Sequence, residues 1–338
     1  MRAGMRRSAQ LRVLTIVALG LGLGLGLGPV GGGQPPLGTI TVMLEWFANP
    51  DHAPLYLAQT NGYFAQRGLR VEIREPGDPS QVPFLAASGS VDVGLSSMFN
   101  FLILKATQGL DALAIGALLM KPLGALVAIR ERGIERLQDL KGGTIGYSVE
   151  PVEPAVYGTM LRAVGLEPGR DVQLVKLDFL SLLPALLAGR VDAIGAFRNF
   201  EPVKVELEGF TPVVFPQEEY GAPESFQLVF LARSGLVDER PEALRAFLGA
   251  VADATLFLLA HPERAKEHFF EALPHLRDEL NLRAYDRTVP IFVGAPCHND
   301  PARWEEGQRF LFEEGILPRT LPLKALFTEE LLPEGCRG

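Results

Sequence analysis

The chain has 338 residues, enough for two domains of ordinary size, and its 47% hydrophobic residues can fill large cores. The formal net charge of −8 argues against nucleic-acid binding, because phosphate contacts need a basic surface. The two cysteines, Cys297 and Cys336, can pair at most once. We therefore expect neither a disulfide framework nor a metal site.

Residues 1–33 have the pattern of a secretory signal peptide. A basic head containing Arg2, Arg6 and Arg7 precedes an apolar stretch and then a run of small residues. The alternative is a membrane anchor, since residues 11–30 are just long enough to span a bilayer. However, the second half of that stretch alternates Leu with Gly, which weakens a helix. We expect cleavage, and a mature protein that is periplasmic or otherwise extracytoplasmic.

The mature chain opens with a predicted β-α-β unit. Residues 40–46 form a short apolar run typical of a buried parallel strand. In the helix that follows, Asp51 can cap, Pro54 suits the first turn and Gly62 suits the end. Residues 69–75 form the next strand, which we expect to run parallel to the first.

The same alternation continues along the chain and indicates open α/β sheets followed by a helical block. Further strands are predicted at residues 91–97, 123–130, 143–148, 171–177, 191–197, 213–215 and 226–233. Helices are predicted at residues 155–164 and 180–187, and in the C-terminal block at 241–260, 262–273 and 301–315.

Two segments, residues 85–94 and 185–194, resemble each other. In each, a helix stops at a glycine, Gly89 or Gly189, and a Val-Asp pair leads into a strand. This can be a common turn used twice, or a sign of two similar domains. The second half of the chain favours two domains, with crossings near residues 121–126 and 220–227. We expect a discontinuous first lobe, residues 39–123 and 225–332, and a second lobe, residues 124–224.

Four segments, residues 44–73, 140–147, 195–209 and 220–223, resemble the NMT1/THI5-like substrate-binding proteins, and the likeness covers nearly all of the mature chain. Within the family it is nearest to the ThiY-type components of ABC transporters for formylaminopyrimidine. The resemblance implies a two-lobed type II periplasmic binding protein that closes on its ligand about a hinge. It also implies a monomer that captures a thiamin pyrimidine precursor, formylaminopyrimidine or hydroxymethylpyrimidine, for a membrane permease.

Ligands of open α/β sheets lie beyond the carboxyl ends of the strands, and four loops occupy that place here. Trp46 and Phe197 can stack on a heteroaromatic ring, and Asn49 can both donate to and accept from its edge. The resemblance implies that Glu201 contacts the pyrimidine, and we expect its removal to change folding little. The candidate ligand-binding residues are Trp46, Asn49, His52, Ser97, Ser148, Phe197, Asn199, Glu201 and Tyr220.

Each candidate also has a structural alternative. Trp46 can pack in the core, and His52 can simply orient its loop. Ser97 can cap the next helix, and Tyr220 can pack at the hinge rather than cover the cleft. Glu153 can be a first-turn acid that the helix dipole favours.

An enzyme and a binding protein for another ligand are the alternative functions. A pyridoxal-phosphate-dependent pyrimidine synthase of the same superfamily would need a Schiff-base lysine, and its fungal examples carry a cysteine-rich segment that this sequence lacks. We therefore expect a protein that is not an enzyme and has no cofactor. A binding protein for riboflavin, an alkanesulfonate or nitrate is the other alternative. Anion binders need Arg, Lys or free helix N-termini at the site.

Overall fold

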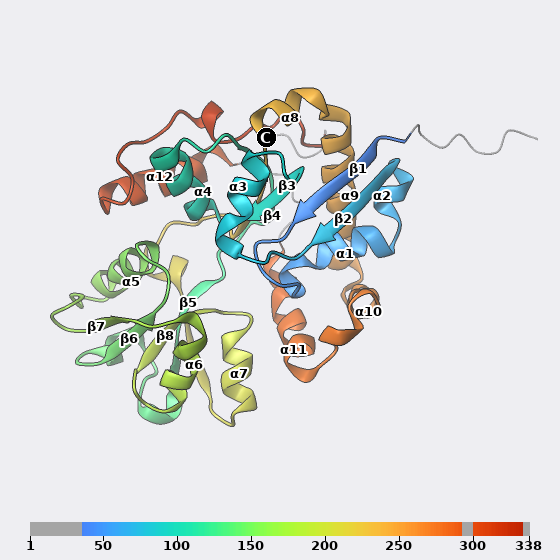
Figure 1. Cartoon of the computed structure of the whole chain (residues 1–338). Coiled ribbons are helices and arrows are strands. Elements are labelled where there is room, and N and C mark those ends of the chain that lie inside the picture. Colours follow the sequence, from blue (N-terminus) through green and yellow to red (C-terminus); the bar gives the residue numbers. More distant parts are fainter. Residues whose placement is uncertain (1–35, 293–299, 334–338) are drawn as a thin grey trace, which may run out of the picture. The chain divides into compact units, whose positions relative to one another are not determined.

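The computed structural model describes residues 36–292 and 300–333, so the predicted signal peptide, Cys297 and Cys336 lie outside the described residues. The fold is a two-lobed α/β fold with two five-stranded sheets, as the sequence predicts (Figure 1). The first sheet has the order β2-β1-β3-β10-β4. Its strands are β1 (Gly38–Met43), β2 (Leu69–Arg74), β3 (Val93–Ser96), β4 (Leu113–Leu119) and β10 (Leu228–Ala232).

The second sheet repeats this arrangement with the order β7-β6-β8-β5-β9. Its strands are β5 (Gly124–Ile129), β6 (Thr144–Tyr147), β7 (Gln173–Lys176), β8 (Ala193–Phe197) and β9 (Pro212–Pro216). The predicted β1–β2 unit is parallel. In each sheet one strand, β10 or β5, is antiparallel to both neighbours, and it is the strand by which the chain enters that sheet from the other one. The sequence prediction missed β4, which lies just before the first crossing.

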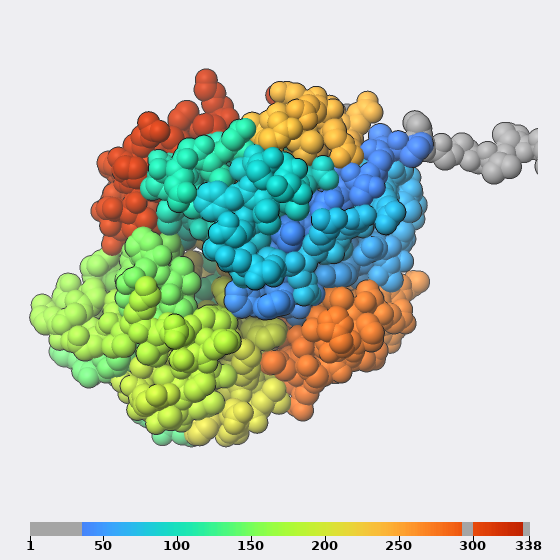
Figure 2. All heavy atoms as spheres, in the orientation of Figure 1, coloured from blue at the N-terminus to red at the C-terminus, as the bar shows by residue number. Residues whose placement is uncertain are grey.

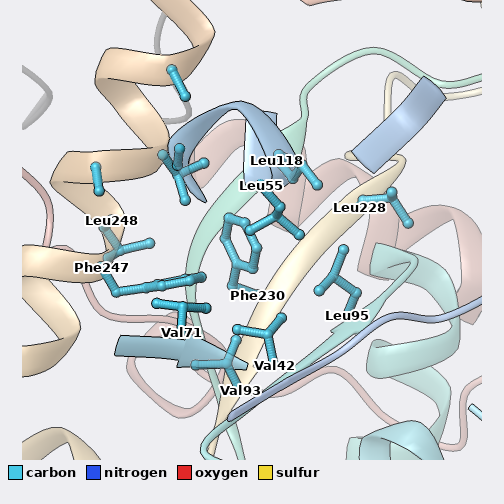
Figure 3. Packing of buried hydrophobic residues seen from close by; sticks show 14 of the residues in the cluster. Val42, Leu55, Val71, Val93, Leu95, Leu118, Leu228, Phe230, Phe247 and Leu248 are labelled. Atoms are coloured by element: carbon cyan, nitrogen blue, oxygen red, sulfur yellow. The ribbon is translucent and has the colours of Figure 1, made fainter. Parts of the chain in front are cut away.

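Helices flank both sheets and form the C-terminal block. They are α1 (Ala53–Thr60), α2 (Tyr63–Gln66), α3 (Val82–Ala87), α4 (Met98–Gln108), α5 (Val152–Ala163), α6 (Phe179–Leu187), α7 (Glu201–Leu207), α8 (Ser234–Glu239), α9 (Pro241–Ala260), α10 (Pro262–Ala272), α11 (Glu279–Thr288) and α12 (Pro301–Glu313). Within the described residues, α9 has the length and hydropathy of a membrane span. In the fold, Phe247 and Leu248 of α9 pack with Phe230 and Val71 in the core of the first lobe (Figure 3).

The repeated Gly-Val-Asp segments form the same corner in both lobes. Gly89 and Gly189 adopt φ values of +74° and +69°, a conformation that favours glycine. Asp92 Oδ2 accepts a hydrogen bond from the Thr41 N–H at 2.8 Å in β1. Asp192 Oδ2 accepts one from the Thr144 N–H at 2.8 Å in β6. Since β1 and β6 hold the same place in their sheets, the two lobes are built on one plan.

The chain crosses between the sheets twice, from β4 to β5 over residues 120–123 and from β9 to β10 over residues 217–227. Gln227 Oε1 accepts a hydrogen bond from the Leu123 N–H at 2.9 Å and so ties the two crossings together. Arg303 of α12 adds a second tie. It donates to the Met120 carbonyl of the first crossing and pairs with Glu224 of the second at 2.8 Å. The exact lobe boundaries, 123/124 and 224/225, stay a prediction.

Candidate functional site

A cavity of ≈ 1180 Å³ lies between the two lobes and is lined by the loops that follow β1, β3, β6 and β8. This is the carboxyl-end location that the sequence predicts for a ligand. Figure 2 shows a hollow between the cyan segments of the first lobe and the green segments of the second. Of the predicted residues, those that line the cavity are Trp46, Asn49, Ser97, Ser148, Phe197, Asn199 and Glu201.

Aromatic side chains from both lobes line the cavity. Trp46 is 42% exposed and Phe197 is 39% exposed, so neither is core packing. Trp46 contacts Phe179 of α6 edge to face, with ring centroids 5.8 Å apart. Sequence reasoning missed Phe179, because a helix start carries no signal of which way a side chain faces. The aromatic rings offer flat contacts to a planar ligand.

Asn199 lies at the meeting point of the two lobes and is almost fully buried. Its Nδ2 donates hydrogen bonds to Asp51 Oδ1 at 2.7 Å and to Thr288 Oγ1 at 2.8 Å. Its Oδ1 is buried and has no hydrogen-bond partner within the described residues. A buried acceptor without a donor is unfavourable, so the polar contact of Asn199 between the lobes is only partly satisfied.

His52 does not line the cavity; it is fully buried beneath the loop after β1. Its Nε2 hydrogen bonds to the Glu45 carboxylate at 3.0 Å, and its Nδ1 accepts from the Asn49 N–H at 3.3 Å. The structure thus gives it the loop-orienting role. The residue that caps the turn Pro50–His52 is Asn49, not Asp51, because Asn49 Oδ1 accepts from the Asp51 N–H at 2.8 Å.

The position of Asp51 perturbs its ionisation. Burial raises the pKa of Asp51 to about 7. His52 and the hydrogen bond from Asn199 act to lower this pKa, whereas the carboxylates of Glu45 and Glu201 raise it further. Asp51 therefore changes charge near neutral pH, at the contact between the lobes.

Glu201 begins α7 and lines the cavity, but it already has partners in the chain. Its Oε2 accepts a hydrogen bond from the Phe197 N–H at 2.9 Å, and its Oε1 pairs with Lys204 Nζ at 3.2 Å. The side chain is only 7% exposed. Each carboxylate oxygen has about two acceptor positions, so Glu201 can still accept from a ligand. The sequence suggests that removing Glu201 changes folding little, whereas these contacts predict a loss of stability.

The loop after β6 is closed in a similar way. Glu153 Oε2 accepts hydrogen bonds from the Ser148 N–H at 2.7 Å and the Val149 N–H at 2.8 Å. Glu153 is thus a cap of this loop as well as a first-turn acid of α5. The Glu153 carboxylate also contributes to a pKa of the buried Tyr157 hydroxyl well above its usual value, after the larger effect of burial.

Two predicted residues have structural roles. Ser97 lines the cavity but caps α4, because its Oγ accepts from the Asn100 N–H at 3.3 Å. Tyr220 does not line the cavity and packs edge to face on Phe215, with ring centroids 6.0 Å apart. Tyr220 thus has the hinge-packing role, since it lies in the second crossing.

The cavity wall is acidic. Among the described residues it carries the carboxyl groups of Glu45, Asp51, Glu153, Asp178 and Glu201, and the basic side chains of Lys176 and Lys204. Both lysines form ion pairs: Lys176 with Glu150 at 2.7 Å, and Lys204 with Glu201 at 3.2 Å. Arg198, the basic residue noted in the sequence, pairs with Glu218 and does not line the cavity. In the described ranges no group of three His, Cys, Asp or Glu residues is placed to hold a metal ion.

Comparison with known proteins identifies relatives that match most of this chain. The family described as NMT1/THI5 like matches residues 49–265. A Haemophilus influenzae protein whose name assigns it to thiamine biosynthesis is 38% identical, over 86% of this chain and 91% of its own length. The formylaminopyrimidine-binding protein of Halalkalibacterium halodurans is 33% identical, over 68% of this chain and 69% of its own length.

The solved structures support the same fold. The periplasmic aliphatic sulphonate binding protein of Escherichia coli matches with a TM-score of 0.69. The match covers 86% of this chain and 92% of that protein at 15% sequence identity. At this identity the match establishes the two-lobed fold of periplasmic binding proteins and not the ligand.

The relatives also overturn one expectation. Proteins of Legionella pneumophila and Schizosaccharomyces pombe, 26% and 28% identical, are named 4-amino-5-hydroxymethyl-2-methylpyrimidine phosphate synthase. The Legionella match covers 87% of this chain and 92% of that protein. The expectation from the sequence that the chain is not an enzyme is therefore wrong. It rested on chemistry that the sequence lacks, whereas relatives that match most of this chain are named as enzymes.

Proposed function

Because the chain belongs to the NMT1/THI5-like family, we propose that it is the extracytoplasmic solute-binding component of an ABC importer. Its ligand is a thiamin pyrimidine precursor, formylaminopyrimidine or hydroxymethylpyrimidine. Two relatives support this ligand class: one is named for thiamine biosynthesis and one for formylaminopyrimidine binding. The partner is a membrane permease, and the binding protein acts as a monomer.

The observation that carries the proposal is the pair of exposed aromatic side chains, Trp46 and Phe197, that line an acidic cavity from the two lobes. An aminopyrimidine has two flat faces and an exocyclic amine that donates hydrogen bonds. Trp46 and Phe197 can contact the faces, each aromatic pair contributing about 0.5–1.5 kcal/mol beyond burial. The amine can donate to the remaining acceptor position of Glu201, one of the carboxyl groups of the cavity wall.

A larger ring is the main alternative ligand. The cavity of ≈ 1180 Å³ exceeds the needs of a single pyrimidine ring, since small-molecule pockets have about 300–1,000 Å³. Riboflavin therefore belongs in every titration beside the two pyrimidines. Further closure of the lobes on a small ligand would reduce the volume.

Calorimetric titration of the purified protein with each pyrimidine and with riboflavin tests the proposal. We expect saturable binding of one pyrimidine and weaker binding by Trp46→Ala. Phe312→Ala is the matched control, because Phe312 is 50% exposed on α12 and does not line the cavity. Wild-type protein that binds neither pyrimidine would overturn the thiamin assignment, and binding of riboflavin alone would replace it.

The synthase relatives call for an activity measurement on the same preparation. The protein is incubated with and without pyridoxal phosphate, and the mixture is analysed for pyrimidine phosphate by mass spectrometry. Formation of this product would replace the transport role with a synthetic one.

Export is tested separately: N-terminal sequencing of protein from its own host should give a start between about residues 28 and 38.

A further inference from the structure

The cavity has two corners at which backbone N–H groups turn toward a carboxylate of the chain itself. At the first corner, after β6, the N–H groups of Ser148 and Val149 share Glu153 Oε2 at 2.7 and 2.8 Å. Adjacent N–H groups that converge on one point are the usual binding geometry for phosphate and sulfate. Here the converging point is occupied by an oxygen of Glu153.

The second corner, after β8, has the same construction. The Phe197 N–H donates to Glu201 Oε2 at 2.9 Å, and Lys204 Nζ lies 3.2 Å from Glu201 Oε1. A backbone N–H beside a lysine is again a donor set that suits an oxyanion. Glu201 occupies it, and the side chain is buried, so bulk water does not screen its charge as it would at the surface.

The corners of the first lobe are capped differently. Asn49 Oδ1 accepts from the Asp51 N–H at 2.8 Å, and Ser97 Oγ accepts from the Asn100 N–H at 3.3 Å. These two caps are uncharged, whereas the Ala48 N–H of the same lobe donates to the Glu75 carboxylate at 3.0 Å. In the second lobe, the carboxylates on the cavity N–H groups are Glu153 and Glu201.

We propose that Glu153 and Glu201 act as built-in anions that exclude anionic ligands from the cavity, phosphate esters of pyrimidines included. A ligand anion would have to displace a carboxylate from its N–H donors or lie beside it in a poorly screened site. Both arrangements are unfavourable because like charges repel. The inference rests on the proposed function and narrows it: the ligand carried in this cavity is uncharged or cationic.

The test uses inorganic phosphate as the probe, with chloride at matched ionic strength as the reference. Glu153→Ala frees two N–H groups, and Glu201→Ala frees one N–H and a lysine. We expect each folded variant to bind phosphate about tenfold or more tightly than wild type, in calorimetry and in phosphate-dependent melting. Glu208→Ala is the matched control, because Glu208 is exposed at the opposite end of α7. It removes the same charge and frees no cavity donor, so its response should equal that of wild type.

A third variant covers the case in which the alanine variants do not fold. Glu153→Gln keeps an oxygen for the two N–H groups and removes only the charge, so it should bind phosphate more tightly than wild type. Strong phosphate binding by wild type, or phosphate binding by the folded variants equal to that of wild type, would overturn the exclusion role. This result does not depend on pyrimidine binding. Loss of the proposed function would instead appear as wild type that binds no pyrimidine.

Discussion

Asn199 Nδ2 in the second lobe donates a hydrogen bond to Asp51 Oδ1 in the first, with 2.7 Å between the two atoms. The same Nδ2 donates to Thr288 on α11, so one amide group joins three segments that are distant in sequence. Glu206 of α7 adds ion pairs to Arg283 and Arg287 of α11. The lobes are thus in direct contact on one side of the cavity.

The ionisation of Asp51 predicts a pH dependence of stability. The folded pKa is about 7 and the reference value is 3.8, so the folded protein holds this proton more tightly than the unfolded chain does. The stability contribution is complete below about pH 4 and is lost as pH rises through about 7. Asp51→Asn cannot ionise, so its free energy of unfolding relative to wild type should increase from pH 5 to pH 8. Urea denaturation of both proteins at each pH measures this difference in the free energy of unfolding. A difference that does not change with pH would contradict the raised pKa of Asp51.

Breaking the contact between the lobes should open the empty protein. Asn199→Ala removes both Nδ2 hydrogen bonds and leaves the buried Asp51 and Thr288 oxygens without this donor. This should cost about 1–3 kcal/mol of stability. Small-angle scattering should give a larger radius of gyration than that of empty wild type. Thr288→Val removes one acceptor at nearly constant shape, so the increase should be smaller. Equal radii for wild type and Asn199→Ala would show that other contacts hold the lobes.

Glu201 should matter for stability as well as for binding. Glu201→Ala leaves the Phe197 N–H without its acceptor in a partly buried corner, at a cost of about 1–3 kcal/mol. Lys204→Met removes only the pairing cation, which is 31% exposed, and should cost about 1 kcal/mol or less. Denaturant titration of the empty variants compares the two. A larger loss in Lys204→Met would mean that the ion pair, and not the cap, is the important contact.

Arg303 should limit the motion of the crossings between the lobes. It contacts the Met120 carbonyl and Glu224, and its guanidinium lies 5.3 Å from the centre of the Phe226 ring. Arg303→Met keeps the apolar stem and removes these polar contacts, so amide hydrogen exchange should accelerate in residues 119–124 and 220–227. Arg303→Lys keeps the charge but not the planar fork, and we expect an intermediate rate. Unchanged amide exchange in Arg303→Met would show that Arg303 does not limit the motion of the crossings.

The sequence predicts those parts of the fold that depend on local pattern. Most strands lie where the apolar runs are, and the β1–β2 pair is parallel as expected. The antiparallel direction of β5 and β10 is not in the pattern, because an apolar run looks the same in either direction. The direction of each of these strands is set by the way in which the chain enters the sheet from the other lobe.

The site follows the same division. Trp46 and Phe197 are predictable because they lie at or just beyond the carboxyl ends of apolar strands, β1 and β8, at the cavity end of the sheets. The partners of Glu153 and Glu201 are backbone N–H groups, which no residue type reveals. Asn49 before Pro50 is a local signal for a cap that favours Asn49 over Asp51, since proline suits the position after a cap. The contact of Asn199 with Asp51 depends on how the lobes meet, which the local pattern does not contain.

The place of β10 between β3 and β4 has a consequence for the order in which the protein can fold. A growing chain makes β1 to β4 first, then the whole second sheet, and only then β10. Until β10 is made, β3 and β4 lack the strand that joins them, whereas the second sheet has all five of its strands in one continuous segment. The second lobe can therefore fold first, and a nascent chain that ends before Leu228 leaves two open strand edges for a chaperone to cover.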